Sequence, residues 1–140
     1  MIYTKSDHLV FARLEKGEFI VEVLTSLCVE LGIQSGWVQG IGAVDRIELG
    51  AWDTMRRVYH RQIWEQAFEV SPITGNVMIK EGKPFLHLHA TVAGHDFQAR
   101  AGHLFEARVN PTLEVFIGTF DHPLQRKFDE ESGLFLAWPL

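Results

Sequence analysis

The feature that most constrains the fold is an alternating run at residues 86–92, in which apolar and polar side chains follow one another without a break. Successive side chains of a β-strand point to opposite faces of its sheet, so a period of two predicts a strand with one buried face. His87 and His89 then lie together on the other face. The run therefore predicts a sheet with a polar pair on one side of it.

The alternation resumes at residues 97–109, and the segment between the two runs, residues 94–96, is typical of a turn. We therefore predict an antiparallel hairpin with His95 exposed in its turn. A three-residue loop centred on His95 places His103 directly opposite His87, on the face of the histidine pair. A two-residue loop would turn His103 to the other face, because a one-residue slip reverses every side chain.

Three neutral imidazoles on one face form the ligand set of a catalytic zinc site whose fourth position is open. We predict a divalent metal bound by His87, His89 and His103. Zinc is the expected ion, although nitrogen ligands also accept other first-row metals. The alternative is that the histidines are polar residues on a solvated strand face.

Several short motifs resemble those of a known family. They are Gly40-Ile41-Gly42-Ala43, Phe68-Glu69-Val70-Ser71 leading to Gly75-Asn76, His87-x-His89, Gly102-His103-Leu104 and Val109-x-x-Thr112-x-Glu114. In order and spacing they resemble the Plants and Prokaryotes Conserved (PPC) domain, over residues 9–120. The resemblance implies an α+β domain, with a mainly antiparallel sheet and one principal helix packed on it, assembled as a homotrimer.

The resemblance also implies roles for particular residues. In the prokaryotic members three histidines form what looks like a metal site near the subunit boundary, and the three histidines of the hairpin are the matching positions. The domain is also similar, at the level of fold, to acetolactate decarboxylase, a zinc enzyme with a three-histidine site. Glu69 and Glu114 fall in strands that the resemblance places near the histidines, where either could donate or accept a proton. The alternative for each is a buried acceptor for a backbone donor or for Arg100 or Arg108.

Two functions follow. The first is a metal-binding homotrimer with a recognition or assembly role linked to DNA-associated partners, since PPC domains in plants accompany AT-hook segments. The Arg-Gly-Arg-Pro core of an AT-hook is absent, and the net charge of −5 works against direct DNA binding. Arg56-Arg57 with His60-Arg61 is the one basic cluster, and it is short enough to be a solvated loop. The second function is a zinc-dependent enzyme that acts on a small hydroxy-keto acid.

Length and composition indicate one domain. The 140 residues are 46% hydrophobic, enough for a single core. We expect a domain core at residues 8–120 and a C-terminal extension at residues 121–140. No apolar run approaches a membrane span and the N-terminus is too polar for a signal peptide, so we expect a cytoplasmic protein with no membrane contact. The single cysteine, Cys28, excludes an intramolecular disulfide and is expected to be buried.

Local patterns predict the remaining elements. A helix should open at Gly17-Glu18 and end at Gly32, with its apolar stripe on the sheet. The glycines of the Gly40-Ile41-Gly42 segment suggest a bulge or a close backbone approach. The apolar residues 133–138 favour either a last strand or burial between subunits. Strands are expected at residues 8–14, 37–39, 44–51, 65–70, 76–80 and 113–120, with a loop at 53–61 and turns at 71–75 and 110–112.

Overall fold

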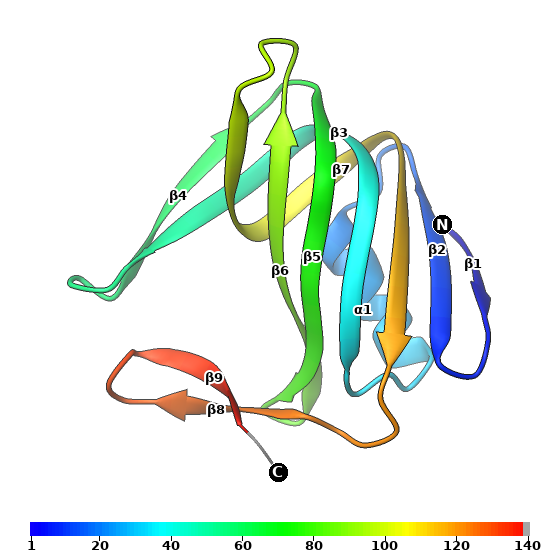
Figure 1. Cartoon of the computed structure of the whole chain (residues 1–140), viewed down its shortest axis with the longest axis vertical. Helices are drawn as coiled ribbons and strands as arrows, with labels where there is room; N and C mark the ends of the chain where they lie inside the picture. The colour runs from blue at the N-terminus through cyan, green and yellow to red at the C-terminus, as the bar shows by residue number, and fades with distance from the viewer. Residues whose placement is uncertain (139–140) are drawn as a thin grey trace.

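The computed structural model describes residues 1–138 as one sheet and one helix (Figure 1). In chain order the elements are β1 (Ile2–Lys5), β2 (Leu9–Glu15), α1 (Ile20–Glu30), β3 (Gly36–Asp53), β4 (Val58–Trp64), β5 (Phe68–Lys80), β6 (Lys83–Ala93), β7 (Ala99–Thr119), β8 (Gln125–Asp129) and β9 (Leu134–Trp138). All strand pairs are antiparallel except a short parallel contact between β5 and β8. The predicted α+β class, with a mainly antiparallel sheet and one helix, is confirmed.

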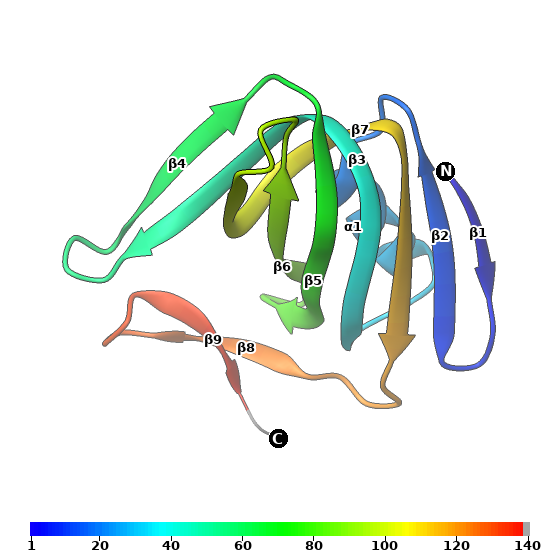
Figure 2. The same cartoon turned by 45° about the horizontal axis from the view of Figure 1, so that its top comes forward.

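The sheet curls around one core because its two longest strands, β3 and β7, bend. β3 pairs with β5, β5 with β6, β6 with β7, and β7 again with β3, so these four strands close a ring. In Figures 1 and 2 the helix lies behind the sheet, and it packs against β6 and β7. Apolar side chains from the ring, from β2 and from α1 fill the space between helix and sheet.

The helix α1 begins at Ile20, later than the expected start at Gly17-Glu18. Gly17 has a φ of +90° and its N–H donates to the carbonyl of Val109, so the chain is still turning at that point. Gly32, with a φ of +66°, follows the last turn as expected. The stripe that faces the core consists of Ile20, Leu24, Leu27 and Cys28.

Two pairs of expected strands are single long strands. Residues 37–39 and 44–51 both belong to β3, and the expected turn at residues 71–75 lies inside β5. Pro111 lies inside β7 rather than in a turn. Proline has no N–H for a strand ladder but is tolerated at bulges, and both Pro72 and Pro111 lie where the pairing register shifts.

The glycines of the Gly40-Ile41-Gly42 segment allow β3 to approach β7 closely. A Cβ at Gly40 would lie 2.9 Å from the backbone oxygen of Glu114, and a Cβ at Gly42 would collide with the backbone of Thr112. The register also shifts between the two glycines. The interpretation as a bulge with a close backbone approach is confirmed.

The ends of the chain and one loop differ from expectation. Strand β1 was not expected, and β4 begins at Val58, inside the segment expected as a loop. The apolar C-terminal segment forms β9, which pairs with β8 in a hairpin that joins the rest of the sheet only through Ile79–Gln125 and Lys80–Arg126. Residues 139–140 of the expected extension lie outside the described residues. Within residues 1–138, no helix has the length and apolar character to cross a membrane.

Candidate metal centre

The three histidines lie on one face of the β6–β7 hairpin, but in a different register from the expected one. His89, rather than His87, lies opposite His103. The reason is the turn: the strands are joined by five residues, 94–98, instead of three, and the pairing moves by two positions. A shift of two keeps every side chain on its face, so the cluster forms all the same.

The geometry of the cluster is compact. The ring centroids of His87, His89 and His103 are 5.2–5.6 Å apart, and each ring offers a nitrogen within 4.8 Å of the other two. Ligand nitrogens around a tetrahedral zinc ion lie roughly 3.3 Å apart, given Zn–N distances of about 2.0–2.1 Å. Small side-chain rotations therefore bring the three nitrogens to ligand distance.

His103 packs among aromatic rings. Its imidazole is between Tyr59 and Phe105, with ring centroids at 5.2 and 4.8 Å. Its Nδ1 atom is buried and has no hydrogen-bond partner among the described residues. A buried polar nitrogen without a partner is rare, and a metal ion would satisfy it.

Burial also sets the protonation state of the site. Together with the neighbouring Arg126 and the other imidazoles, which act in the same direction, burial lowers the pKa of both His87 and His103 to about 4. Both rings are therefore neutral near pH 7. Neutral imidazole is the form that binds a metal, so the donor set fits a divalent ion.

One contact competes with that ion. Arg126, on β8, donates from Nη2 to Nδ1 of His87 over 2.9 Å. A guanidinium has only donors, so Nδ1 is the acceptor and the ring proton lies on Nε2. A metal bound through Nε2 needs that proton on Nδ1, and a metal bound through Nδ1 needs the lone pair that Arg126 occupies. Metal binding by His87 therefore requires Arg126 to turn away.

Two further groups hold Arg126 in place. Its Nη2 donates to Oδ1 of Asn76, which lies opposite His87 on β5, and its Nη1 donates to the backbone oxygen of Phe135, both over 2.9 Å. Arg126 and Asn76 were missed in the sequence. Arg126 lies in a charged stretch typical of an exposed tail, and only the non-local pairing of β8 with β5 brings it to the histidines.

Glu69 and Glu114 do not lie at the histidines in this chain. They line a separate hollow of about 420 Å³ together with Ile41 and Thr112, and both are exposed. The expected arginine partners bind elsewhere: Arg108 pairs with Asp45 at 2.6 Å and Arg100 with Asp96 at 3.1 Å.

Other predicted positions agree with expectation. His95 is exposed in the turn, and Cys28 is buried, which raises its thiol pKa to about 12. Three members of the short basic cluster face carboxylates, since Arg56 and His60 lie against Asp53 and Arg61 against Glu48.

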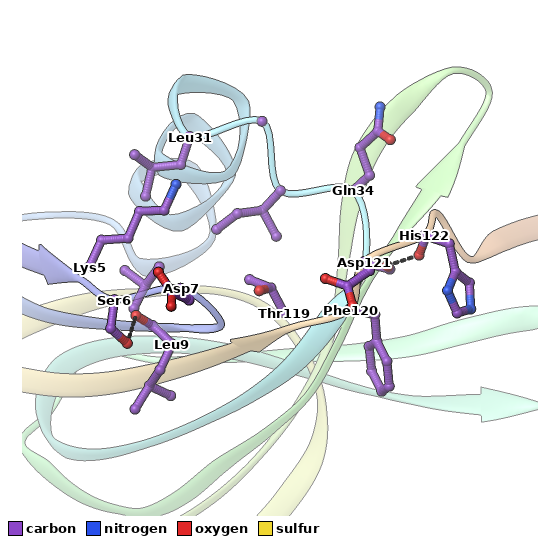
Figure 3. A pocket seen from close by; sticks show the side chains of 14 residues that line it. Lys5, Ser6, Asp7, Leu9, Leu31, Gln34, Thr119, Phe120, Asp121 and His122 are labelled. Carbon is purple, nitrogen blue, oxygen red and sulfur yellow. Dashed lines mark hydrogen bonds between the residues drawn. The ribbon is translucent and has the colours of Figure 1, made fainter.

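A second hollow lies apart from the histidine cluster, since none of the three histidines lines it. It has a volume of about 200 Å³ between the end of α1, the β1–β2 turn and residues 119–122 (Figure 3). Its rim is held by two hydroxyl groups: Ser6 donates to the carbonyl of Leu9, and Ser35 to that of His122. Among residues 1–138, the three histidines form the one close group of three potential metal ligands, and this hollow contains no such group.

Several solved structures resemble this one. A proposed DNA-binding protein from Bacteroides thetaiotaomicron is 29% identical, with a TM-score of 0.94 over 97% of this chain and 95% of its own. A metal-containing protein from Archaeoglobus fulgidus is 30% identical, with a TM-score of 0.88 over 99% of both chains. The α-acetolactate decarboxylase of Bacillus subtilis shares the fold alone, at 9% identity and a TM-score of 0.54, over 79% of this chain and 51% of the enzyme.

A comparison with curated proteins found no match. The family model of the Plants and Prokaryotes Conserved domain, abbreviated PCC or PPC, matches residues 1–121. That match covers most of the chain, including every strand of the ring, the helix and all three histidines. The chain therefore belongs to the Plants and Prokaryotes Conserved domain family.

Proposed function

We propose that this protein is a homotrimeric domain that binds one divalent metal per chain through His87, His89 and His103, and that it serves in recognition or assembly. The observation that carries the proposal is the group of three imidazoles with nitrogens within 4.8 Å of one another. The metal-containing relative from Archaeoglobus fulgidus supports it. Zinc is the proposed ion, because a set of three imidazole nitrogens suits it.

Metal content by mass spectrometry tests the proposal on untagged protein. We expect about one zinc per chain in the wild type and its loss in His103→Ala. His95→Ala is the matched control, because this histidine lies exposed in the turn of the same hairpin and should not affect the metal. Equal metal content in the two variants, or none in the wild type after incubation with zinc, would overturn the proposal.

The proposed trimer has its own support. Trp37, Ile41 and Phe116 are 44–56% exposed on the sheet face opposite α1. They alternate with side chains that face the core, so no further part of the described chain covers them. An apolar group of this kind on one face is typical of an interface between subunits. Light scattering should give about three times the 16.0 kDa of one chain, and a monomer at micromolar concentration would contradict the proposal.

A link to DNA rests on relatives such as the proposed DNA-binding protein from Bacteroides thetaiotaomicron. The charges of this chain favour an indirect link, through protein partners that bind DNA. The net charge is −5, and the basic cluster of the β3–β4 hairpin is largely neutralised by Asp53 and Glu48. We expect no shift of a DNA duplex at physiological salt, and salt-dependent binding would favour direct contact instead.

An enzyme is the second candidate, and one observation favours it: a pocket of about 510 Å³ adjoins His87 and His103. The reaction would be that of a zinc-dependent enzyme on a small hydroxy-keto acid, with the metal polarising the substrate oxygen. Glu69 and Glu114 are the proposed proton carriers, and a neighbouring subunit would have to bring them to the pocket. Glu69→Gln should then abolish turnover and leave metal content intact. Unchanged turnover would remove Glu69 from the mechanism.

A further inference from the structure

The pocket beside the histidines has the size and lining of a small-molecule site. Its volume of about 510 Å³ lies within the usual range for ligand pockets, roughly 300–1,000 Å³. The β8–β9 hairpin forms one wall, and Figure 1 shows this hairpin lying beneath the arm formed by β3 and β4. Aromatic rings from five strands line it: Trp52, Tyr59, Phe85, Phe105 and Phe135.

The charged lining is entirely cationic. Lys80 and Arg126 both line the pocket, and no Asp or Glu among residues 1–138 does. Within residues 1–138, neither cation forms a salt bridge with a carboxylate. The ammonium of Lys80 lies instead 4.1 Å from the ring centre of Phe135 and 5.0 Å from that of Phe85. Two unneutralised cations in an acidic protein point to an anionic ligand.

Arg126 has donors to offer such a ligand. Its Nε atom is buried without a hydrogen-bond partner among the described residues, and one Nη2 bond goes to His87. That bond must break when His87 binds a metal, which would release a second donor. The guanidinium presents its donors in a flat fork that matches the two oxygens of a carboxylate.

We infer that this pocket binds a small organic carboxylate with a flat apolar body, its carboxylate held by Arg126 and Lys80 and its body packed among the aromatic rings. The size of the aromatic wall favours an organic acid over inorganic phosphate, which would leave that wall uncovered. The binding itself depends only on this chain's residues. Strengthening by metal rests on the proposed function, since it requires His87 to exchange Arg126 for the ion.

Isothermal titration calorimetry tests the inference with three probes: 3-phenylpropanoate, its neutral amide and inorganic phosphate. The metal-free wild type should bind the carboxylate saturably. The amide and phosphate should bind at least about tenfold more weakly, because the amide lacks the negative charge and phosphate lacks the apolar body. Arg126→Gln and Lys80→Gln should each weaken carboxylate binding by about tenfold or more. Arg13→Gln, at an exposed arginine of β2, is the matched control and should bind as the wild type does.

Lys80→Gln keeps the test valid if Arg126→Gln disturbs the β8–β9 hairpin, because the Lys80 ammonium donates no hydrogen bond within residues 1–138. Equal affinity for acid and amide, or unchanged affinity in Lys80→Gln, would overturn the inference. Phosphate binding as tightly as the carboxylate would overturn it too, in favour of a plain anion site. Carboxylate binding without metal binding would refute only the proposed metal function, and metal binding without carboxylate binding would refute only this inference.

Discussion

The guanidinium of Arg126 lies 2.9 Å from Nδ1 of His87, in the position that a metal or the ring proton would need. The C-terminal hairpin and the metal thus compete for the same imidazole. This relationship connects the tail of the chain to the chemistry of the histidine face.

Replacing Arg126 with Gln should therefore strengthen zinc binding. The change removes a like charge and frees His87, and the new amide oxygen can accept the Nδ1 proton of a metal-bound ring. We expect a decrease of about tenfold in the Kd for zinc, the effect of one charged hydrogen bond. Competition with a chromophoric chelator measures it. Arg13→Gln should leave the Kd unchanged, and an unchanged Kd in Arg126→Gln would show that the arginine does not compete.

Acidification should destabilise the metal-free protein. Burial lowers the pKa of His87 and His103 from 6.5 to about 4. Between these values the unfolded chain binds more protons than the folded one, so the free energy of unfolding falls as pH falls. Because both rings are partly exposed to solvent, we expect a loss of about 1–2 kcal/mol per histidine from pH 6.5 to pH 4. Urea denaturation in the presence of a chelator measures it.

The controls for this pH dependence come from the same hairpin. His103→Asn should flatten the slope, because one of the two buried imidazoles is gone, whereas His95→Asn should keep the slope of the wild type. A slope that is equally steep in both variants would assign the effect to other groups.

Glu106 should be required for the stability of the helix. Its carboxylate, on β7, accepts from the N–H groups of Val21 and Glu22 at 2.8 and 3.2 Å, while the N-cap residue Phe19 offers no side-chain cap. Glu106→Ala leaves these donors unpaired and should lower the free energy of unfolding by about 1–3 kcal/mol. Chemical denaturation of this variant beside Glu130→Ala, an exposed glutamate near the chain end, checks it. Equal stability of the two variants would exclude a capping role.

Gly75→Ala should disturb the metal site by displacing the backbone of the strand that carries His87. A Cβ at Gly75 would collide with the backbone carbonyl of His87 on the neighbouring strand, which cannot give way as a flexible side chain does. We expect a loss of stability of about 1–3 kcal/mol and weaker metal binding, measured by thermal unfolding and by metal content. Gly94→Ala is the matched control, because its new Cβ would meet only atoms 3.3 Å or more away. Wild-type behaviour of Gly75→Ala would mean that β5 and β6 can separate freely.

Trp37→Ser should dissociate the proposed trimer. The indole lies over Gly118, where any Cβ would collide with it, and it is 46% exposed on the sheet face opposite α1. Its loss removes the largest apolar side chain of the proposed interface. Size-exclusion chromatography with light scattering should show a smaller species than the wild type. Met55→Ser, at a 92% exposed position of the β3–β4 turn, should leave the mass unchanged, and an intact trimer in Trp37→Ser would exclude this face.

The histidine cluster could be predicted from the sequence because it requires only that His103 lie on the same face of the sheet as His87 and His89. Any even shift in the pairing of β6 with β7 keeps it there. A pairing error of two residues leaves His103 on the correct face, so the cluster tolerated the wrong loop length. The loop length itself was beyond prediction. The five-residue turn has Phe97 at a φ of +54°, and phenylalanine carries no local signal for that conformation.

The predicted turns at residues 71–75 and 110–112 were wrong, because the proline and glycine residues of these segments lie inside strands. Pro72 and Pro111 are typical of turns, but long-range pairing absorbs both in bulges of β5 and β7. Arg126 could not be found for a related reason. Nothing in the local pattern of β8 distinguishes it from its neighbour Lys127, and only the tertiary contact with β5 turns one of them toward His87.

The β8–β9 hairpin joins the rest of the sheet through two residue pairs, and the family match ends at residue 121, before Arg126. The part of the chain that builds the ring and the histidines is thus separate from the part that carries the competing arginine and one aromatic wall of the pocket. A substitution in the hairpin can therefore change what the pocket accepts while the ring that carries the imidazoles keeps its own strand pairing.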